Sequence, residues 1–312
     1  MKGRLRFREV AVLNMLYTNN DLGRFAKDPA VIELDGYYYM YHSIMIDKTL
    51  GIGVARSDDG DSFELIAGFP LTQECEKNGV GAPGAIVIDG TVHLFYQTYG
   101  NGKLDAICHA TSTDGVNFTK DETNPIFAPR EPYMAMPEWS CGRAIDADVC
   151  IFGTKLFLYW ATRDREFKRQ IVGVAAAPLD SGFGRGSFEG CPDIVLEPTL
   201  PWEKDCIEAP AAMVRDGKVY LFYAGAYNCA PQRVGCAVSS DGYHFERLYV
   251  EDALLKEGAP GEWNSCESGH PYIYPANDGR IWLYYQGSND MGKTWYLSRR
   301  EICFVGDMPT VV

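Results

Sequence analysis

The chain has 312 residues and a formal net charge of −13, because 29 Lys and Arg stand against 42 Asp and Glu. This negative field repels nucleic acid and anionic membrane surfaces, so we expect neither as a partner and favour a small molecule or a neutral polymer. Aromatic residues make up 13% of the chain beside 32 Gly and 17 Pro, a balance typical of turn-rich strands and not of helices.

The cysteines and the N-terminus give few signals. Ten cysteines occur without any C-x-x-C spacing, which argues against a zinc ribbon or a thioredoxin-type redox site. The apolar run over residues 10–16 is short, is interrupted by Asn14 and has no small-residue cleavage site after it. No stretch of about 18 apolar residues occurs in the sequence. We therefore expect a cytoplasmic protein with free thiols.

One sequence unit recurs five times and consists of a strand, a turn with glycine and an aromatic strand. The copies span residues 31–43, 86–98, 149–162, 212–225 and 272–287. Four of the turns contain Asp-Gly, a pair that tolerates the positive φ of a two-residue hairpin turn. The turn glycines are 54 to 64 residues apart. A repeat of this length, with about four short strands, is typical of the blades of a β-propeller.

A second hairpin follows in three of the units, with the pattern S-x-D-G-x-x-F beginning at Ser57, Ser112 and Ser239. Asp-Gly supplies turn geometry without any further role, so we interpret this pattern as structural. No helix and no linker is evident. The prediction is an all-β fold, a single domain over residues 1–312, built as a five-bladed β-propeller with a central active-site channel. The blades are expected to begin near residues 28, 82, 146, 208 and 270.

Ionisable residues stand at the entrance of four of the five first strands. The innermost strands of a propeller line one channel, so we expect Asp28, Asp146, Glu208 and His270 to occupy equivalent positions at one mouth of it. The second entrance, Ala82-Pro83, has no ionisable group. Crowded carboxyls raise one another's pKa, so one can stay protonated while another is ionised. Two carboxyls that flank a sugar bond are the minimum for glycoside hydrolysis.

The motifs at these entrances resemble those of glycoside hydrolase family 43 and its wider arabinanase, levansucrase and invertase superfamily. The matching segments are Asp28-Pro29, residues 144–149, residues 207–210 and residues 269–271, and the resemblance spans about residues 24–303. It implies an inverting hydrolase that cleaves an oligosaccharide or glycoside and releases a sugar such as arabinose, xylose or galactose. In this resemblance Asp28 is the general base, Glu208 is the general acid, and Asp146 orients the acid and adjusts its pKa.

Two assignments stay open at this point. His270 resembles the family histidine that holds an ion, often calcium, or water in the channel, but a lone histidine is not in itself a metal site. The resemblance implies no cofactor for the chemistry and allows a structural calcium. Asp148 lies two residues beyond Asp146 on the same side of a strand, so either could hold the third acidic role.

Further candidates for substrate binding lie shortly before the entrances. Flat aromatic rings stack on sugars, although each could equally be a packing residue. An arginine near a catalytic acid can bind a hydroxyl or steady the carboxylate. The candidates are Arg24, Trp139, Arg143, Trp202 and Trp263.

Three alternatives keep the fold and change the function. A retaining fructosidase-like hydrolase would carry N-D-P, R-D-P and E-C motifs, whereas this chain has Lys27-Asp28-Pro29, Ile145-Asp146 and Glu208-Ala209. A mannoside phosphorylase would need a phosphate-binding cluster, for which the basic loop 163–169 is the only candidate. A non-catalytic sugar-binding propeller would lack one of the acids, and none is missing. The sequence specifies neither the sugar and its linkage, nor exo or endo action, nor the oligomeric state.

Overall fold

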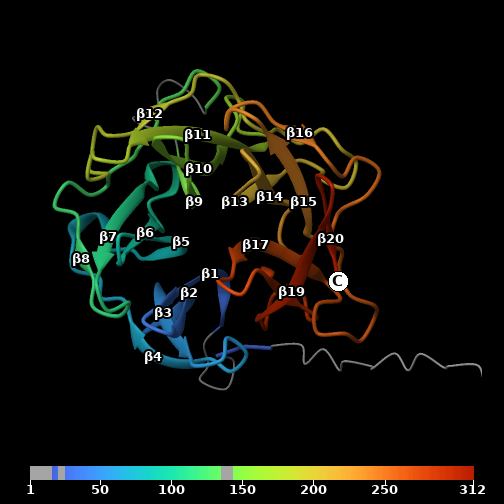
Figure 1. Ribbon diagram of the computed structural model, residues 1–312, viewed down its shortest axis with the longest axis horizontal. Helices are drawn as coiled ribbons and strands as arrows, with labels where there is room; N and C mark the ends of the chain where they lie inside the picture. Colours follow the sequence, from blue (N-terminus) through green and yellow to red (C-terminus); the bar gives the residue numbers. More distant parts are fainter. Residues whose placement is uncertain (1–15, 20–24, 135–142) are drawn as a thin grey trace, which may run out of the picture.

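The computed structural model describes residues 16–19, 25–134 and 143–312, which form five antiparallel sheets of four strands each. Figure 1 shows the sheets arranged around a central axis, with the first strand of each sheet nearest to it. We call the sheets blades one to five. Blades one and two contain β1 (Lys27–Leu34), β2 (Tyr37–Ile46), β3 (Thr49–Ser57), β4 (Glu64–Gly68), β5 (Val80–Ile88), β6 (Thr91–Thr98), β7 (Ile107–Ser112) and β8 (Thr119–Lys120). Blades three to five contain β9 (Ile145–Phe152), β10 (Lys155–Arg163), β11 (Gln170–Pro178), β12 (Glu189–Gly190), β13 (Ile207–Arg215), β14 (Lys218–Gly225), β15 (Arg233–Ser239), β16 (Glu246–Arg247), β17 (Glu267–Pro275), β18 (Ile281–Ser288), β19 (Tyr296–Val305) and β20 (Met308–Val311).

The prediction of an all-β, five-bladed propeller is confirmed. Within the described ranges the only helical elements are two 3-10 turns, η2 (Glu74–Glu76) and η3 (Gly102–Leu104). No helix in these ranges has the length and apolar character needed to cross a membrane.

The inner strands form a closed ring. β1 contacts β5 and β17, β9 contacts β5 and β13, and β13 contacts β17. Tyr17, which precedes the first blade, pairs with Leu297 of β19 through two backbone hydrogen bonds of 2.8 Å. The start of the described chain is thereby attached to the last blade, so the ring is closed by main-chain pairing as well as by side-chain packing.

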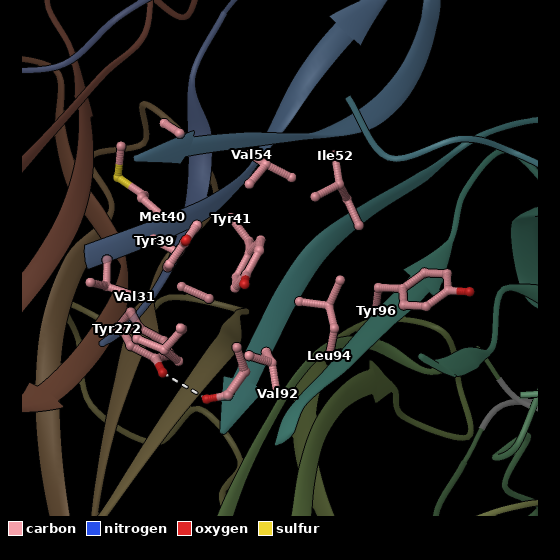
Figure 2. Packing of buried hydrophobic residues seen from close by; sticks show 14 of the residues in the cluster. Val31, Tyr39, Met40, Tyr41, Ile52, Val54, Val92, Leu94, Tyr96 and Tyr272 are labelled. Carbon is pink, nitrogen blue, oxygen red and sulfur yellow. Dashed lines mark hydrogen bonds between the residues drawn. The ribbon is translucent and has the colours of Figure 1, made fainter. Parts of the chain in front are cut away.

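The second strand of each blade is buried on both faces, as its aromatic sequence predicts. Figure 2 shows this packing around β2, where Tyr39 and Tyr41 lie among apolar side chains of the neighbouring strands. Tyr272 of blade five reaches across and donates a hydrogen bond of 2.8 Å to the carbonyl of Ala85 in blade two. Each buried aromatic or branched side chain of this kind contributes about 1.5–3 kcal/mol through burial.

The S-x-D-G segments form tight turns, in agreement with the structural interpretation. Ser57 Oγ donates to Asp59 Oδ1 at 2.9 Å, and the same carboxylate oxygen accepts the backbone N–H of Asp61 at 2.8 Å. Blade five has an equivalent turn at Ser288 and Asp290, where the glycine comes one residue later. Turns of this kind also join blades, because Tyr159 in blade three donates to the carbonyl of Gly242 in blade four at 2.9 Å.

We expect Tyr159→Phe to lower the free energy of unfolding by about 1 kcal/mol, because it removes one buried hydrogen bond between blades and leaves the Gly242 carbonyl without that donor. Urea titration would measure the change. Tyr37→Phe is the matched control, since Tyr37 is exposed on β2 and should be neutral. Equal stability of the Tyr159→Phe variant and the wild type would show that this hydrogen bond does not hold the blades together.

Candidate active site

A cavity of about 540 Å³ lies at one mouth of the central channel and is lined by residues from all five blades. Asp28, Asp146, Glu208 and His270 all line it, so the structure brings these four sequence candidates together. Arg143 lines it as well. The other residues that line the cavity are Phe25, Lys27, Met45, Lys48, Thr49, Leu50, Asn78, Ala82, Gln97, Tyr99, Ile145, Asn228 and Trp295.

A local distortion aims the side chains into the cavity. One residue near the start of each inner strand has a positive φ, between 41° and 54°, and the ladder to the second strand is interrupted there. These residues are Asp28, Ala82, Asp146, Ala209 and His270. Non-glycine residues rarely adopt such φ values, and strained positions of this kind cluster at functional sites.

The equivalence that we expected for Glu208 is therefore wrong by one residue. Ala209 occupies the position that matches Asp28, and Glu208 matches Lys27, the residue before the distortion in blade one. The error arose because the distance to the turn glycine varies by a residue between blades, so spacing alone does not fix the register. Glu208 still faces the cavity from its own position.

Side chains of the preceding blade hold these distorted residues. The backbone N–H of Asp28 donates to Gln286 at 3.1 Å, that of Ala82 to Ser43 at 2.8 Å, and that of Asp146 to Gln97 at 2.8 Å. The N–H of His270 donates to Gln232 at 3.0 Å. Glycine is needed at position 269 for this last contact, since an added Cβ would stand 1.9 Å from Gln232 Oε1.

Asp28 lies between two basic groups. His270 Nδ1 is 3.1 Å from Asp28 Oδ1, and Lys27 Nζ is 4.0 Å from the same oxygen. Burial acts to raise the pKa of Asp28, but His270 and Lys27 together hold it below the usual value. Among Asp28, Asp146 and Glu208, Asp28 alone has a pKa below the usual value, so it is the one that gives up its proton most readily.

Glu208 has the opposite shift. Burial raises the pKa of Glu208, although the amide of Gln232 donates to its Oε1 at 2.7 Å and the charge of Lys27 acts against the shift. Gln170 donates to the other carboxylate oxygen. The buried Glu267, on blade five, adds to the rise because it is a second negative charge nearby.

Asp146 and Asp148 differ in position. Burial raises the pKa of Asp146 to about 6, His270 opposes the rise, and the charges of Glu208 and Asp28 add to it. Asp148 is absent from the cavity lining, and its Oδ2 accepts the backbone N–H of Ala212 at 2.7 Å. Burial raises the pKa of Asp148 to about 7. The geometry thus links Asp146 to the cavity and Asp148 to the packing between blades three and four.

The donors around His270 do not fit a calcium ion. Calcium takes six to eight oxygen ligands, whereas His270 presents an imidazole whose Nδ1 already contacts Asp28. No group of three or more His, Cys, Asp or Glu suited to a metal occurs in the part of the chain that the structure describes. We therefore assign no step to a metal.

The two predicted tryptophans that the structure describes do not line this cavity. Trp202 is buried and stacks on Tyr223, with ring centroids 5.9 Å apart. Trp263 packs on Tyr285 at 5.5 Å. Neither lines the cavity, because both fill space within their blades. Arg24 and Trp139 lie outside the described residues.

Sequence reasoning missed other residues of the cavity. Trp295 and Tyr99 supply its aromatic walls, and Lys27 lies with Nζ 4.5 Å from the centre of the Trp295 ring. The glutamines left a signal, since Gln97 and Gln286 each follow an aromatic residue at the end of a second strand. The only sequence signal for Lys27 was its position next to Asp28.

The basic loop over residues 163–169 does not reach the cavity. Lys168 pairs with Glu166 at 2.6 Å, and Arg169 pairs with Asp164 at 3.2 Å and with Glu197 at 2.7 Å. Lys168 and Arg169 are thus engaged by acids of their own neighbourhood, and Arg163 donates to the hydroxyl of Tyr227. No residue of the loop lines the cavity.

Comparison with known proteins agrees with the fold and identifies the family. The family model described as glycosyl hydrolases family 43 matches residues 17–305. Among solved structures, a thermostable family-43 glycoside hydrolase is 20% identical, with a TM-score of 0.71 over 92% of this chain and 93% of that one. An endo-1,4-beta-xylanase from Bacteroides thetaiotaomicron is also 20% identical, with a TM-score of 0.69 over 92% and 94%.

An exo-1,5-alpha-L-arabinanase from a bovine ruminal metagenomic library is 18% identical, with a TM-score of 0.68 over 99% of this chain and 100% of that one. At these identities the structural likeness shows the fold alone. A comparison with curated proteins finds no match. The family match covers almost the whole chain, and the chain therefore belongs to glycosyl hydrolase family 43 and is a glycoside hydrolase with a carbohydrate substrate.

Proposed function

We propose that this hydrolase cleaves its glycosidic bond with inversion of configuration, with Asp28 as general base, Glu208 as general acid and Asp146 as the carboxyl that adjusts the pKa of the acid. One observation supports the proposal above the others. The pKa values of Asp28 and Glu208 are shifted in opposite directions within one cavity. Two carboxyls whose pKa values are shifted in opposite directions can remove one proton and supply another at the same pH.

The base step uses the ionised Asp28. Its carboxylate takes a proton from a water molecule as the water oxygen attacks the anomeric carbon. His270 contacts Asp28 Oδ1 and so fixes the direction of the carboxylate. The positive charge of Lys27 nearby disfavours protonation of Asp28 before the reaction.

The acid step uses the protonated Glu208. Its proton passes to the glycosidic oxygen as the bond to the anomeric carbon breaks, which leaves Glu208 as a carboxylate. The amides of Gln232 and Gln170 donate to its two oxygens and stabilise that carboxylate. Burial keeps the proton on Glu208 until the leaving oxygen is in place.

The proposal on the substrate class is supported by the names of structural neighbours, which include a xylanase and an arabinanase. We propose a plant or microbial oligosaccharide whose released sugar is a pentose or galactose. Tyr99 and Trp295 are the aromatic side chains of the cavity on which a sugar ring could stack. Trp295 is buried and Tyr99 is half exposed, so Tyr99 is the more open platform.

Asp28→Asn and Glu208→Gln should each lower kcat by about two to four powers of ten, because each removes one proton-transfer group. A screen of aryl arabinofuranoside, xyloside, galactoside and mannoside, with and without phosphate, identifies the substrate for the assay. Proton NMR of the wild-type reaction should show the inverted anomer first.

Circular dichroism is the control for folding of both variants. Retention of near-full activity by either variant would overturn its assigned role. A retained anomer would favour fructosidase-like chemistry, and a requirement for phosphate would favour a phosphorylase.

The dependence of kcat/KM on pH should be bell-shaped. The acid limb reports Asp28 and lies below the usual Asp value of about 3.9, and the alkaline limb reports Glu208 and lies above the usual Glu value of about 4.3. Lys27 lowers both pKa values, so Lys27→Met should move both limbs to higher pH. Lys155→Met, on the exposed start of β10, is the control. An unmoved profile in Lys27→Met would exclude this electrostatic role.

Asp146→Asn and Asp148→Asn should separate the third acidic role from a structural one. Loss of the Asp146 charge should lower the pKa of Glu208 and move the alkaline limb to lower pH. Asp148→Asn should instead change stability. The folded-state pKa of Asp148 is about 7, above its unfolded value, so the wild type loses stability as pH rises from about 4 to 7.

The size of that loss is at most about 4 kcal/mol, and the Asp148→Asn variant lacks it. Urea titrations across this pH range would measure it, with Asp216→Asn at an exposed turn as the control. If Asp148→Asn moves the kcat/KM profile and Asp146→Asn does not, the two roles are exchanged.

A further inference from the structure

The cavity is lined by cationic side chains, two of which have no role in the proposed proton transfers. Lys27, Lys48 and Arg143 all line it. Lys27 has a partner, because it lies 4.0 Å from Asp28 and over the ring of Trp295. Lys48 and Arg143 form no ion pair with any carboxylate that the structure describes. The charge of Arg143 acts on the carboxyls of Asp105, Asp146 and Glu208, but at no ion-pair distance. Lys48 and Arg143 thus face the cavity with no direct ion-pair partner among the described residues, in a chain whose net charge is −13.

Both cations border the part of the cavity next to blade two. Lys48 lies in the turn between β2 and β3, and the nearby Leu50 packs closely on Gly81, where an added Cβ would stand 2.8 Å from Leu50 Cδ2. Arg143 is fixed from the other side, because the N–H of the next residue, Ala144, donates to the carbonyl of Asp105 at 2.8 Å.

The distorted residue of blade two is Ala82. Because alanine is small and not ionisable, blade two has no charged side chain at this position. We call the part of the cavity lined by Lys48, Arg143, Ala82, Gln97 and Tyr99 the blade-two sector, and none of these five residues carries a carboxyl.

Unused donors point to the same sector. Arg143 Nε is buried and has no hydrogen-bond partner among the described residues. Gln97 accepts the N–H of Asp146 with its oxygen, and its amide nitrogen has no acceptor within the described part of the chain. Tyr99 lines the cavity and is 48% exposed, so its ring is open to a sugar that enters the sector. A guanidinium, an ammonium and an amide N–H around one space are the donors that bind a carboxylate or a sulfate.

We propose that the blade-two sector binds an anionic substituent of the glycan, a uronic acid carboxylate or a sulfate ester, between Lys48 and Arg143. Tyr99 packs against the sugar ring that carries the substituent. A wholly neutral glycan would give Lys48 no ion-pair partner and would offer Arg143 Nε no charged acceptor. The inference rests on the proposed glycosidase function and specifies the class of its substrate.

The test uses pairs of glycans that differ only in charge. The probes are acidic oligosaccharides from pectin and glucuronoxylan and sulfated galactan oligosaccharides, each compared with its carboxyl-reduced or desulfated form. Both kcat/KM and the calorimetric Kd are measured. We expect the wild type to favour the charged form of at least one pair by about tenfold or more, and this preference to fall as ionic strength rises.

Lys48→Glu should lower that preference by about tenfold, because it places a negative charge beside the substituent. Lys48→Gln is the milder variant should charge reversal disturb the hairpin, and it should lower the preference in the same direction. Lys155→Glu makes the same charge change at the hairpin of β9 and β10 outside the cavity, and it should keep the wild-type preference. A preference for the charged member of the carboxyl pairs would identify a carboxylate as the anion that the sector binds. A preference for the sulfated member of the other pair would identify a sulfate ester.

The outcomes separate this inference from the proposed function. Hydrolysis of charged and neutral forms at equal rates would overturn the anionic sector and leave the glycosidase intact. Charge-selective binding without hydrolysis of any glycan would overturn the catalytic assignment and support the sector. An unchanged preference in both Lys48 variants would assign the selectivity to other residues and overturn the inference.

Discussion

The active-site cavity depends on one repeated interaction, the hydrogen bond from the N–H of a strained residue to a side chain of the preceding blade. Ser43, Gln97, Gln232 and Gln286 each accept such a bond. A positive φ at a non-glycine residue costs roughly 1–3 kcal/mol, so it persists only where the surroundings compensate for it. At Asp28, Ala82, Asp146 and His270 the bond does this and also couples the blade to the one before it. The geometry of the site and the contact between these blades therefore share one cause.

Burial and charge then distribute protons over a small space. All the carboxyls of the cavity lose water, which by itself would raise every pKa. His270 and Lys27 reverse this for Asp28. At Glu208 the amide of Gln232 and the charges of Lys27 and Arg143 oppose the rise without reversing it, and the charge of Glu267 adds to it. The balance of neighbouring charges thus differs between two carboxyls of equal burial. The five strand entrances are structurally similar, but their side chains and neighbouring charges differ.

The fold could be predicted from the sequence because turn glycines and aromatic strands recur in each unit of the repeat. Such local signals depend little on residues that are distant in the sequence. The gathering of Asp28, Asp146, Glu208 and His270 followed from the repeat alone. The register of Glu208 could not be predicted from the repeat. A strand distortion shifts Glu208 by one residue, and no residue type in the sequence indicates that shift. Trp202 and Trp295 show the other limit. Both are tryptophans near a strand entrance, and only three-dimensional packing decides which fills a blade and which faces the cavity.

The residue that precedes each strained position has a consequence for how this scaffold can acquire new specificities. Those five places hold Lys27, Gly81, Ile145, Glu208 and Gly269. At two of them a larger side chain would displace a neighbour, since a Cβ at position 81 would stand 2.8 Å from Leu50 Cδ2 and one at position 269 would stand 1.9 Å from Gln232 Oε1. Substitution at the inner rim is therefore least disruptive in blades one, three and four. A change of substrate choice through the rim would be made most easily in those three blades.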